Sequence, residues 1–208
     1  MSKGWCEEVK TYDQIAQHYD RGISPFQRWF LNDMRRKVLQ ALPRDAHILE
    51  LGAGTGLNFQ HYSTSAHGVA TEPSAEMLRV ARTKERPRSL VLVQSCAEQI
   101  PFADASFDAA FATLVFCSVE SPKQGFLELK RVVKPGGTVV LLEHVRPPGL
   151  LGYLFDLMNL ITSLLFDDHL NRRPAEQIRT CGFEVVGVES RYLGIINFIT
   201  CKLQGGAA

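Results

Sequence analysis

Residues 46–56, Ala-His-Ile-Leu-Glu-Leu-Gly-Ala-Gly-Thr-Gly, decide the fold of this chain. A short apolar run ends in three glycines spaced G-x-G-x-G, and we expect a helix to begin directly afterwards. Glycine lets the main chain pass close to a ligand because no side chain stands in the way. In an open α/β sheet, the first strand-to-helix turn is a place where ligands bind. The stretch therefore predicts a ligand-binding α/β domain.

Outward from this loop, short apolar runs alternate with helical patterns, as in βαβ units that build a parallel sheet. The last two runs are joined by a short turn near Gly194, which implies an antiparallel hairpin. We predict an α/β fold with a Rossmann-like, seven-stranded, mainly parallel sheet, an antiparallel edge strand and helices on both faces. The strands are expected at residues 47–51, 68–72, 90–93, 107–114, 137–143, 183–190 and 195–203.

The chain of 208 residues is interpreted as one domain with a helical extension. Residues 1–45 are expected to form an N-terminal helical lid, with helices at 11–19 and 25–41. Residues 46–208 would form the compact domain, with a helical insertion at 149–181. Within it, Ser74 is expected to cap a helix over 74–81, and a second helix over 122–133 would stop at Lys134-Pro135-Gly136-Gly137.

Composition excludes several classes of function. Basic and acidic residues number 23 and 22, so no global field attracts nucleic acid. The five cysteines are scattered and form no CxxC pair, which argues against a zinc site and a disulfide framework. The amino terminus has no apolar signal core. We therefore expect a cytoplasmic protein.

The acids around the glycine loop suggest which ligand binds. Dinucleotide folds use G-x-G-x-x-G and place a pyrophosphate on the helix N-terminus. Here Glu50 precedes the loop and would lie near the cationic end of a ligand, which suits an amino acid sulfonium better than a pyrophosphate. Glu72, at the end of the second strand, could accept both hydroxyls of a ribose. The alternative is a plain glycine turn with two solvated acids.

Four ordered blocks carry a family resemblance: ELGAGTG (50–56), ATEPSAEML (70–78), CAEQIPFADASFDAAFATLVF (96–116) and LKRVVKPGGTVVLLEH (129–144). They resemble the class I methyltransferases of the type-11 or ubiquinone/menaquinone methyltransferase group, which use S-adenosyl-L-methionine (SAM). The resemblance implies that the glycines hold the methionine part, Glu72 the ribose, and residues 97–98 the adenine. The cofactor-binding residues it implies are Glu50, Gly52, Ala53, Gly54, Gly56, Glu72, Pro73, Ala97, Glu98, Thr113 and Leu114.

The acceptor is less well defined by the sequence. Residues 113–119, 142–145 and 164–172 are similar to the methyltransferase-like 7 subfamily of thiol methyltransferases, which implies thiol S-methylation. Phosphatidylethanolamine N-methyltransferases and quinone-precursor methyltransferases remain alternatives. A nicotinamide-dependent oxidoreductase and a SAM-binding partner subunit without catalysis are further alternatives. The expected partner is a small-molecule or lipophilic methyl acceptor, and the oligomeric state stays open.

Two residues are candidates for catalysis. His144 ends the fifth expected strand, at the edge where an acceptor should enter, and could act as a general base. Tyr19 belongs to a segment that resembles the N-terminal helix closing over SAM in relatives. For each, a purely structural role is the alternative. The residues Asp167-Asp168-His169 are rejected as a metal site because neighbours on a turn rarely converge on one ion.

Two apolar segments raise the question of a membrane. Residues 149–166 carry one charge, Asp156, and lie between two strands of one sheet, where a bilayer span would disrupt the domain. A lid over an apolar acceptor, or a helix with peripheral contact to a membrane surface, fits better. Residues 24–39 combine aromatic and basic side chains, for which packing against the core is favoured over an interfacial helix.

Overall fold

The computed structural model describes residues 9–150, 152, 153, 155–157 and 172–205. About half of the expected insertion at 149–181, including Asp167, Asp168 and His169, therefore falls outside the described residues. So does most of the 164–172 segment on which the thiol methyltransferase resemblance partly rests. Within the described part of the chain, no helix is long and apolar enough to cross a membrane.

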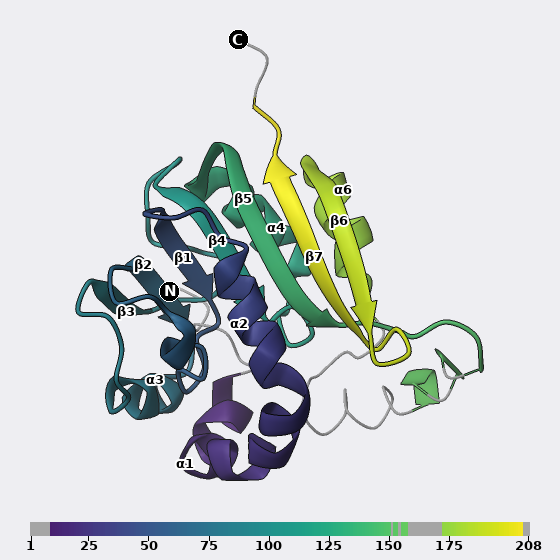
Figure 1. Cartoon of the computed structure of the whole chain (residues 1–208), viewed down its shortest axis with the longest axis horizontal. Coiled ribbons are helices and arrows are strands. Elements are labelled where there is room, and N and C mark those ends of the chain that lie inside the picture. Colours follow the sequence, from purple (N-terminus) through teal and green to yellow (C-terminus); the bar gives the residue numbers. More distant parts are fainter. Residues whose placement is uncertain (1–8, 151, 154, 158–171, 206–208) are drawn as a thin grey trace, which may run out of the picture.

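A seven-stranded sheet forms the centre of the molecule, in the order β3-β2-β1-β4-β5-β7-β6 (Figure 1). β7 pairs antiparallel with both β5 and β6, and the remaining pairs are parallel. The predicted sheet and its antiparallel edge are thus confirmed. The strands are β1 (His47–Leu51), β2 (His67–Glu72), β3 (Leu90–Gln94), β4 (Phe107–Thr113), β5 (Val133–His144), β6 (Phe183–Arg191) and β7 (Ile196–Leu203).

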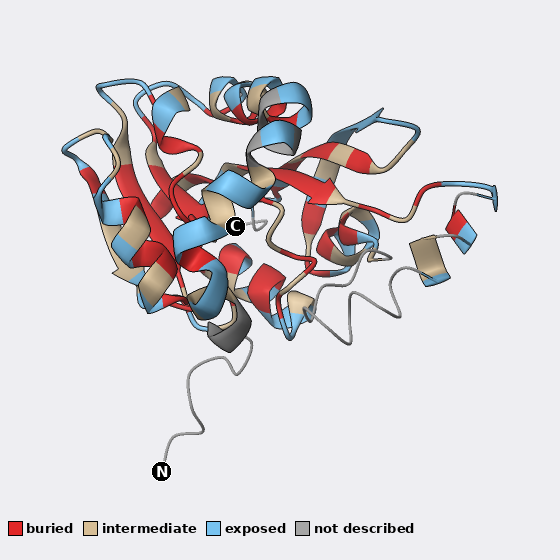
Figure 2. Ribbon diagram, turned by 90° about the horizontal axis from the view of Figure 1, so that it is seen from below, coloured by how far each residue is buried: buried red, intermediate tan, exposed pale blue. Residues whose placement is uncertain are grey.

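Both faces of the central strands are buried, which explains why these strands are almost wholly apolar. Successive side chains of a strand point to opposite faces, and two separate cores follow from this alternation. On one face, Leu49 and Leu141 pack in a cluster with Phe126 and Leu129 of helix α4 (Pro122–Val132). On the other face, Ile48 belongs to a cluster with Leu31, Met34 and Val38. Buried residues accordingly fill the sheet and the helix sides that face it (Figure 2).

The helices are α1 (Val9–Phe26), α2 (Asn32–Gln40), α3 (Ala75–Arg82), α4 (Pro122–Val132) and α6 (Pro174–Thr180). α2 lies over one face of the sheet, and α4 and α6 lie over the other, whereas α1 lies across the end at which the parallel strands terminate (Figure 1). Ser74 caps α3 as predicted, since its Oγ accepts a hydrogen bond from the Met77 amide at 3.0 Å.

Three features differ from the sequence-based expectation by more than one residue. The predicted break between residues 19 and 25 is absent, because α1 continues to Phe26 and passes through a π-helical turn, Gln27–Leu31, into α2. Pro25 lacks the amide that a regular helix would use, and the wide turn follows directly after it. β5 begins at Val133 rather than at Gly137. Its first residue pairs with Phe107 before a register shift.

The segment after the glycine loop is the third difference. No α-helix begins directly after Gly56. Residues 57–66 contain only the 3-10 helix Phe59–His61. The hydroxyl of Ser63 accepts a hydrogen bond from the Ser65 amide at 3.2 Å. Serine side chains that bond the local backbone in this way compete with helical hydrogen bonds.

Candidate active site

The glycine loop lies at the carboxyl end of β1, between β2 and β4, where the strand order reverses direction. Gly52, Gly54 and Gly56 have φ values of 68°, 54° and 81°, a region that non-glycine residues rarely adopt. A Cβ atom on Gly52 would lie 2.4 Å from Val115 Cγ2, whereas one on Gly54 would meet nothing within 4 Å. The backbone at Gly54 therefore faces open space that a ligand can approach.

Glu72, the last residue of β2, faces this loop. The residue is 7% exposed, and its carboxylate oxygens accept hydrogen bonds from the amides of Gly54 at 2.9 Å and Ser74 at 3.0 Å. Burial raises the pKa of the Glu72 carboxyl to about 7, although the two amides act in the opposite direction. Each oxygen accepts only one of these bonds, so it keeps a lone pair for a further donor.

A cavity connects these groups, and together with the solvent space at its mouth it encloses about 940 Å³. Tyr12 and Tyr19 of α1 line one side of it. Of the residues predicted from the sequence, those that line the cavity are Tyr19, Gly52, Ala53, Gly54, Glu72, Pro73, Ala97, Glu98, Thr113 and Leu114. The remaining three, Glu50, Gly56 and His144, do not line it.

Glu50 is fully buried behind the loop instead. Its oxygens accept hydrogen bonds from Asn58 Nδ2 at 2.6 Å and from the Tyr62 hydroxyl at 2.8 Å. Burial raises the pKa of the Glu50 carboxyl, and the nearby Arg35 guanidinium counteracts part of that rise. Glu50, which was expected beside the ligand, thus accepts hydrogen bonds from side chains behind the cavity wall.

Gly56 and His144 likewise are not part of the cavity wall. Gly56 packs against Phe59, since a Cβ on it would come within 2.4 Å of that ring. His144 ends β5 and is paired with Ile196 of the antiparallel β7. Of the two catalytic candidates, Tyr19 therefore lines the cavity and His144 does not.

Two carboxylates of α1 hold this helix against the loops of the site. Asp13 Oδ1 accepts hydrogen bonds from Ser74 Oγ at 2.5 Å and from the Glu76 amide at 3.3 Å, both at the start of α3. Asp20 accepts from Thr55 Oγ1 at 2.5 Å and forms an ion pair with Lys84 at 2.6 Å. Both contacts join α1 to segments that carry residues of the cavity wall.

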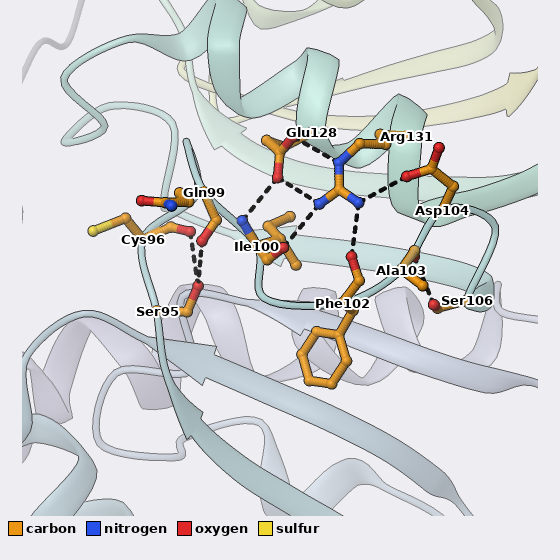
Figure 3. Close-up of polar contacts among 10 residues, drawn as sticks. All are labelled: Ser95, Cys96, Gln99, Ile100, Phe102, Ala103, Asp104, Ser106, Glu128 and Arg131. Atoms are coloured by element: carbon orange, nitrogen blue, oxygen red, sulfur yellow. Dashed lines mark hydrogen bonds and ion pairs between the residues drawn. The ribbon is translucent and has the colours of Figure 1, made fainter.

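A second helix, α4, holds another loop near the cavity. Its Arg131 binds the loop that follows residues 97 and 98 (Figure 3). Its guanidinium donates to the carbonyl oxygens of Ile100 at 2.8 Å and Phe102 at 2.7 Å. It also pairs with Glu128 at 2.8 Å and Asp104 at 2.9 Å. Glu128 in turn accepts from the Ile100 amide, so the loop is tied to α4 by side-chain bonds in both directions.

Comparison with known proteins agrees with this geometry. Residues 49–141 match the family model described as a methyltransferase domain. Over these residues the chain is similar to the methyltransferase domain of this family. The family implies SAM as the cofactor, and the residues fit it: Gly54 offers bare backbone to the cavity, and Glu72 offers a carboxylate with free lone pairs.

Individual relatives extend the match. The chain is 33% identical over 117 residues to the thiol S-methyltransferase TMT1B of Rattus norvegicus, covering 54% of this chain and 48% of that protein. It is 35% identical over 155 residues to the demethylmenaquinone methyltransferase of Clavibacter sepedonicus, covering 71% and 62%. The chain thus spans about half to two thirds of the length of these curated relatives.

A solved structure supports the methyltransferase fold along almost the whole chain. The SAM-dependent methyltransferase of Thermotoga maritima, described as a possible histamine N-methyltransferase, superposes with a TM-score of 0.73 at 20% identity. The match covers 95% of this chain and all of that one.

The most important residue that the sequence reasoning missed is Arg35. It lines the cavity of the methyltransferase domain although it is only 5% exposed. A signal was present, because Leu31, Met34 and Val38 form an apolar helical stripe in which Arg35 occupies a core position. A charge on the buried stripe of an amphipathic helix indicates a special role more strongly than a charge on its outer face.

Proposed function

We propose that this protein transfers the methyl group of SAM to a small, apolar acceptor, with a thiol as the favoured class. The observation that supports the proposal best is the cavity in which bare backbone at Gly54 faces the buried carboxylate of Glu72. SAM, when bound there, supplies an activated methyl group on its sulfonium sulfur. The residues of the chain bind and orient the two reactants and limit access of water.

The wall near the end of β4 suits an apolar acceptor. Leu114, Val115 and Val119 line the cavity there, and Leu57 and Tyr19 add further apolar surface. Leu114 has a φ of 58°, and its amide donates to the Leu142 carbonyl at 2.7 Å. Strained backbone of this kind persists where the surroundings hold it in place, and it clusters at functional sites.

Thiol chemistry needs little further machinery. A thiolate is itself the nucleophile, whereas an amine acceptor must lose a proton and a phenolic acceptor benefits from a base. Tyr19 lines the cavity and is proposed to position the acceptor, with proton transfer as a second role. Thiol S-methylation is also the activity named for the Rattus norvegicus relative.

A quinone precursor is the second candidate, because the relative from Clavibacter sepedonicus is named a demethylmenaquinone methyltransferase. Phosphatidylethanolamine is the third candidate. All three are lipophilic or small molecules, and the proposal includes no nucleic acid.

Transfer of radiolabelled methyl from SAM to a panel of alkyl thiols, quinols and phosphatidylethanolamine distinguishes these acceptors. We expect label in an alkyl thiol. Label only in a quinol or in the phospholipid would replace the thiol assignment. Binding of SAM without label in any acceptor would favour a SAM-binding partner subunit. Calorimetry with SAM and with NAD tests the ligand itself, and we expect heat of binding for SAM alone.

A further inference from the structure

A second groove lies beside the candidate active site. It is formed by the segment after the glycine loop and by the connection between α3 and β3, and together with the solvent space at its mouth it encloses about 1340 Å³. Leu57 lines both this groove and the cavity of the candidate active site. The connection contributes three cations and one acid to the lining: Lys84, Arg86, Arg88 and Glu85. We call this hollow the basic groove.

The two arginines of the basic groove have no carboxylate to neutralise them. Arg86 Nη1 donates to main-chain carbonyls, those of Arg82 at 3.4 Å and Lys84 at 3.5 Å. Neither Arg86 nor Arg88 forms an ion pair with any residue that the structure describes, and the side chain of Arg88 makes no hydrogen bond there. Exposed arginines of α2 and α3, by contrast, pair with an acid of their own helix. Two unneutralised guanidiniums that line one hollow indicate a site for an anion.

Phosphate is the anion that fits this lining best. The planar fork of a guanidinium matches phosphate oxygens through two parallel hydrogen bonds. Basic and acidic residues are almost equal in number over the whole chain, so the excess of cations here is local and attracts anions to this groove in particular. Leu57, Phe59 and Tyr62 also line the groove and offer apolar surface to the organic part of a phosphate monoester.

Lys84 links the basic groove to α1. Its Nζ forms an ion pair with Asp20 Oδ2 at 2.6 Å and donates to Thr55 Oγ1 at 3.3 Å. Asp20 also accepts a hydrogen bond from Thr55 at 2.5 Å. An ammonium group has three donors and no acceptor, so it can exchange a carboxylate for a phosphate. A phosphate in the groove therefore competes with Asp20 for Lys84.

We propose that the basic groove binds a phosphate monoester, and that the bound phosphate draws Lys84 from Asp20 and loosens α1 over the adjacent cavity. Binding of phosphate is independent of the proposed function. Its effect on α1 rests on that function, because the effect is seen through SAM. Inorganic phosphate and the head group of phosphatidic acid share the chemistry that the groove recognises.

Calorimetry with inorganic phosphate at constant ionic strength tests the groove directly, since salt screens exposed charges. We expect saturable binding to wild type, and a loss of affinity of about 10-fold in Arg88→Gln and about 100-fold in the double variant Arg86→Gln/Arg88→Gln. Arg82→Gln is the matched control, because Arg82 is exposed in the same basic stretch but does not line the groove. It should change the affinity by about 2-fold at most.

Two results would overturn the site: no saturable binding of phosphate to wild type, or equal losses of affinity in Arg82→Gln and Arg88→Gln. Thermal unfolding checks each variant. If the double variant does not fold, Arg88→Gln carries the test, because it removes no hydrogen bond to a described residue.

Co-sedimentation with phosphatidylcholine vesicles, with and without phosphatidic acid, identifies the source of the phosphate. Binding that needs phosphatidic acid and is lost in Arg88→Gln would assign the groove to a lipid head group. Binding of inorganic phosphate without binding to these vesicles would assign it to a soluble phosphate monoester.

Stopped-flow displacement of SAM tests the link through Lys84. Phosphate should raise the dissociation rate of SAM several-fold in wild type. It should have no effect in the double variant, which lacks the site, or in Asp20→Ala, in which the ion pair with Lys84 is already absent. An unchanged rate in phosphate-saturated wild type would overturn the link. Failure of wild type to bind SAM would overturn the proposed function, and calorimetry with phosphate would still test the groove.

Discussion

At the scale of single residues, Glu72 is the group whose protonation matters most for the candidate site. It is buried, it faces the glycine loop, and its pKa is raised to about 7. Ribose hydroxyls donate hydrogen bonds, so they favour the ionised carboxylate that can accept from both. A ligand that prefers the ionised carboxylate displaces the proton of Glu72 when it binds.

The affinity for SAM should therefore depend on pH near neutrality. Affinity should be constant well above pH 7 and fall as the pH drops below 7, approaching about 10-fold per pH unit at the limit. Titration calorimetry between pH 5.5 and 8.5 measures this. Glu72→Ala should abolish SAM binding, and Glu72→Gln should bind weakly with no pH dependence in this range. If Glu72→Ala binds SAM as strongly as wild type, the ribose assignment is wrong.

Gly52 provides a second residue-scale prediction. Gly52→Ala should weaken SAM binding because the new methyl group would displace Val115, a residue of the cavity wall. The positive φ adds about 1–2 kcal/mol of backbone strain. Gly136→Ala is the control for strain alone, since Gly136 has a φ of 78° and nothing within 4 Å of its would-be Cβ. We expect loss of stability in both variants and loss of SAM affinity only in Gly52→Ala.

At the scale of elements, α1 and α4 hold the loops of the site from two sides. α1 is bound through Asp13 to the start of α3 and through Asp20 to Thr55 and Lys84. Arg131 of α4 plays the corresponding part for the loop that follows Ala97 and Glu98 (Figure 3). Rigid elements position such loops more precisely than the loops could position themselves.

The contacts of Asp20 predict how fast SAM leaves the site. Asp20→Ala should raise the dissociation rate of SAM several-fold, because α1 then loses its bonds to Thr55 and Lys84 while Tyr12 and Tyr19 remain. Stopped-flow displacement measures this rate. Asp33→Ala serves as control, since Asp33 is exposed and pairs with Arg36 away from the cavity. Equal dissociation rates in the two variants would contradict a lid role for α1.

Arg131 is expected to affect stability. Arg131→Ala removes bonds to two backbone carbonyls and two carboxylates, and we expect a loss of about 2 kcal/mol in the free energy of unfolding. Hydrogen bonding to Arg131 lowers the pKa of Glu128, so this contribution is present above the usual pKa of glutamate and is lost as the pH falls. Urea unfolding at pH 7 and pH 4 should show the wild-type advantage shrinking in acid. Arg173→Ala, which breaks an exposed pair with Glu176, should change little.

At the scale of the whole molecule, the order of the strands decides what meets at the cavity. β1 is flanked by β2 and β4, so the glycine loop, Glu72 and Thr113 come together at one edge. β5 lies one strand further out, and its last residue is paired with β7. Glu72 and Thr113, at the ends of β2 and β4, therefore line the cavity, whereas His144, at the end of β5, does not.

His144 and Tyr19 are distinguished by this arrangement. We expect His144→Ala to keep near wild-type turnover, because His144 does not line the cavity. Tyr19→Phe should lower kcat if the hydroxyl moves a proton, and should change only KM if the ring positions the acceptor. Initial rates with SAM and a thiol measure both variants. A large fall in kcat for His144→Ala, with SAM affinity intact, would restore it as the general base.

The sequence by itself determined the parallel sheet with its antiparallel edge, the capped helix α3 and most of the cofactor cavity. These features depend on local signals: apolar periodicity, a capping serine, and glycines and acids placed directly at strand ends. Only the tertiary structure decided that Glu50 turns away from the cavity, that His144 lies outside it, and that Arg35 and Arg131 reach across to distant loops. The physical reason is that hydrogen bonds between side chains far apart in sequence depend on how the elements pack, and no local pattern records which partners that packing brings within bonding distance.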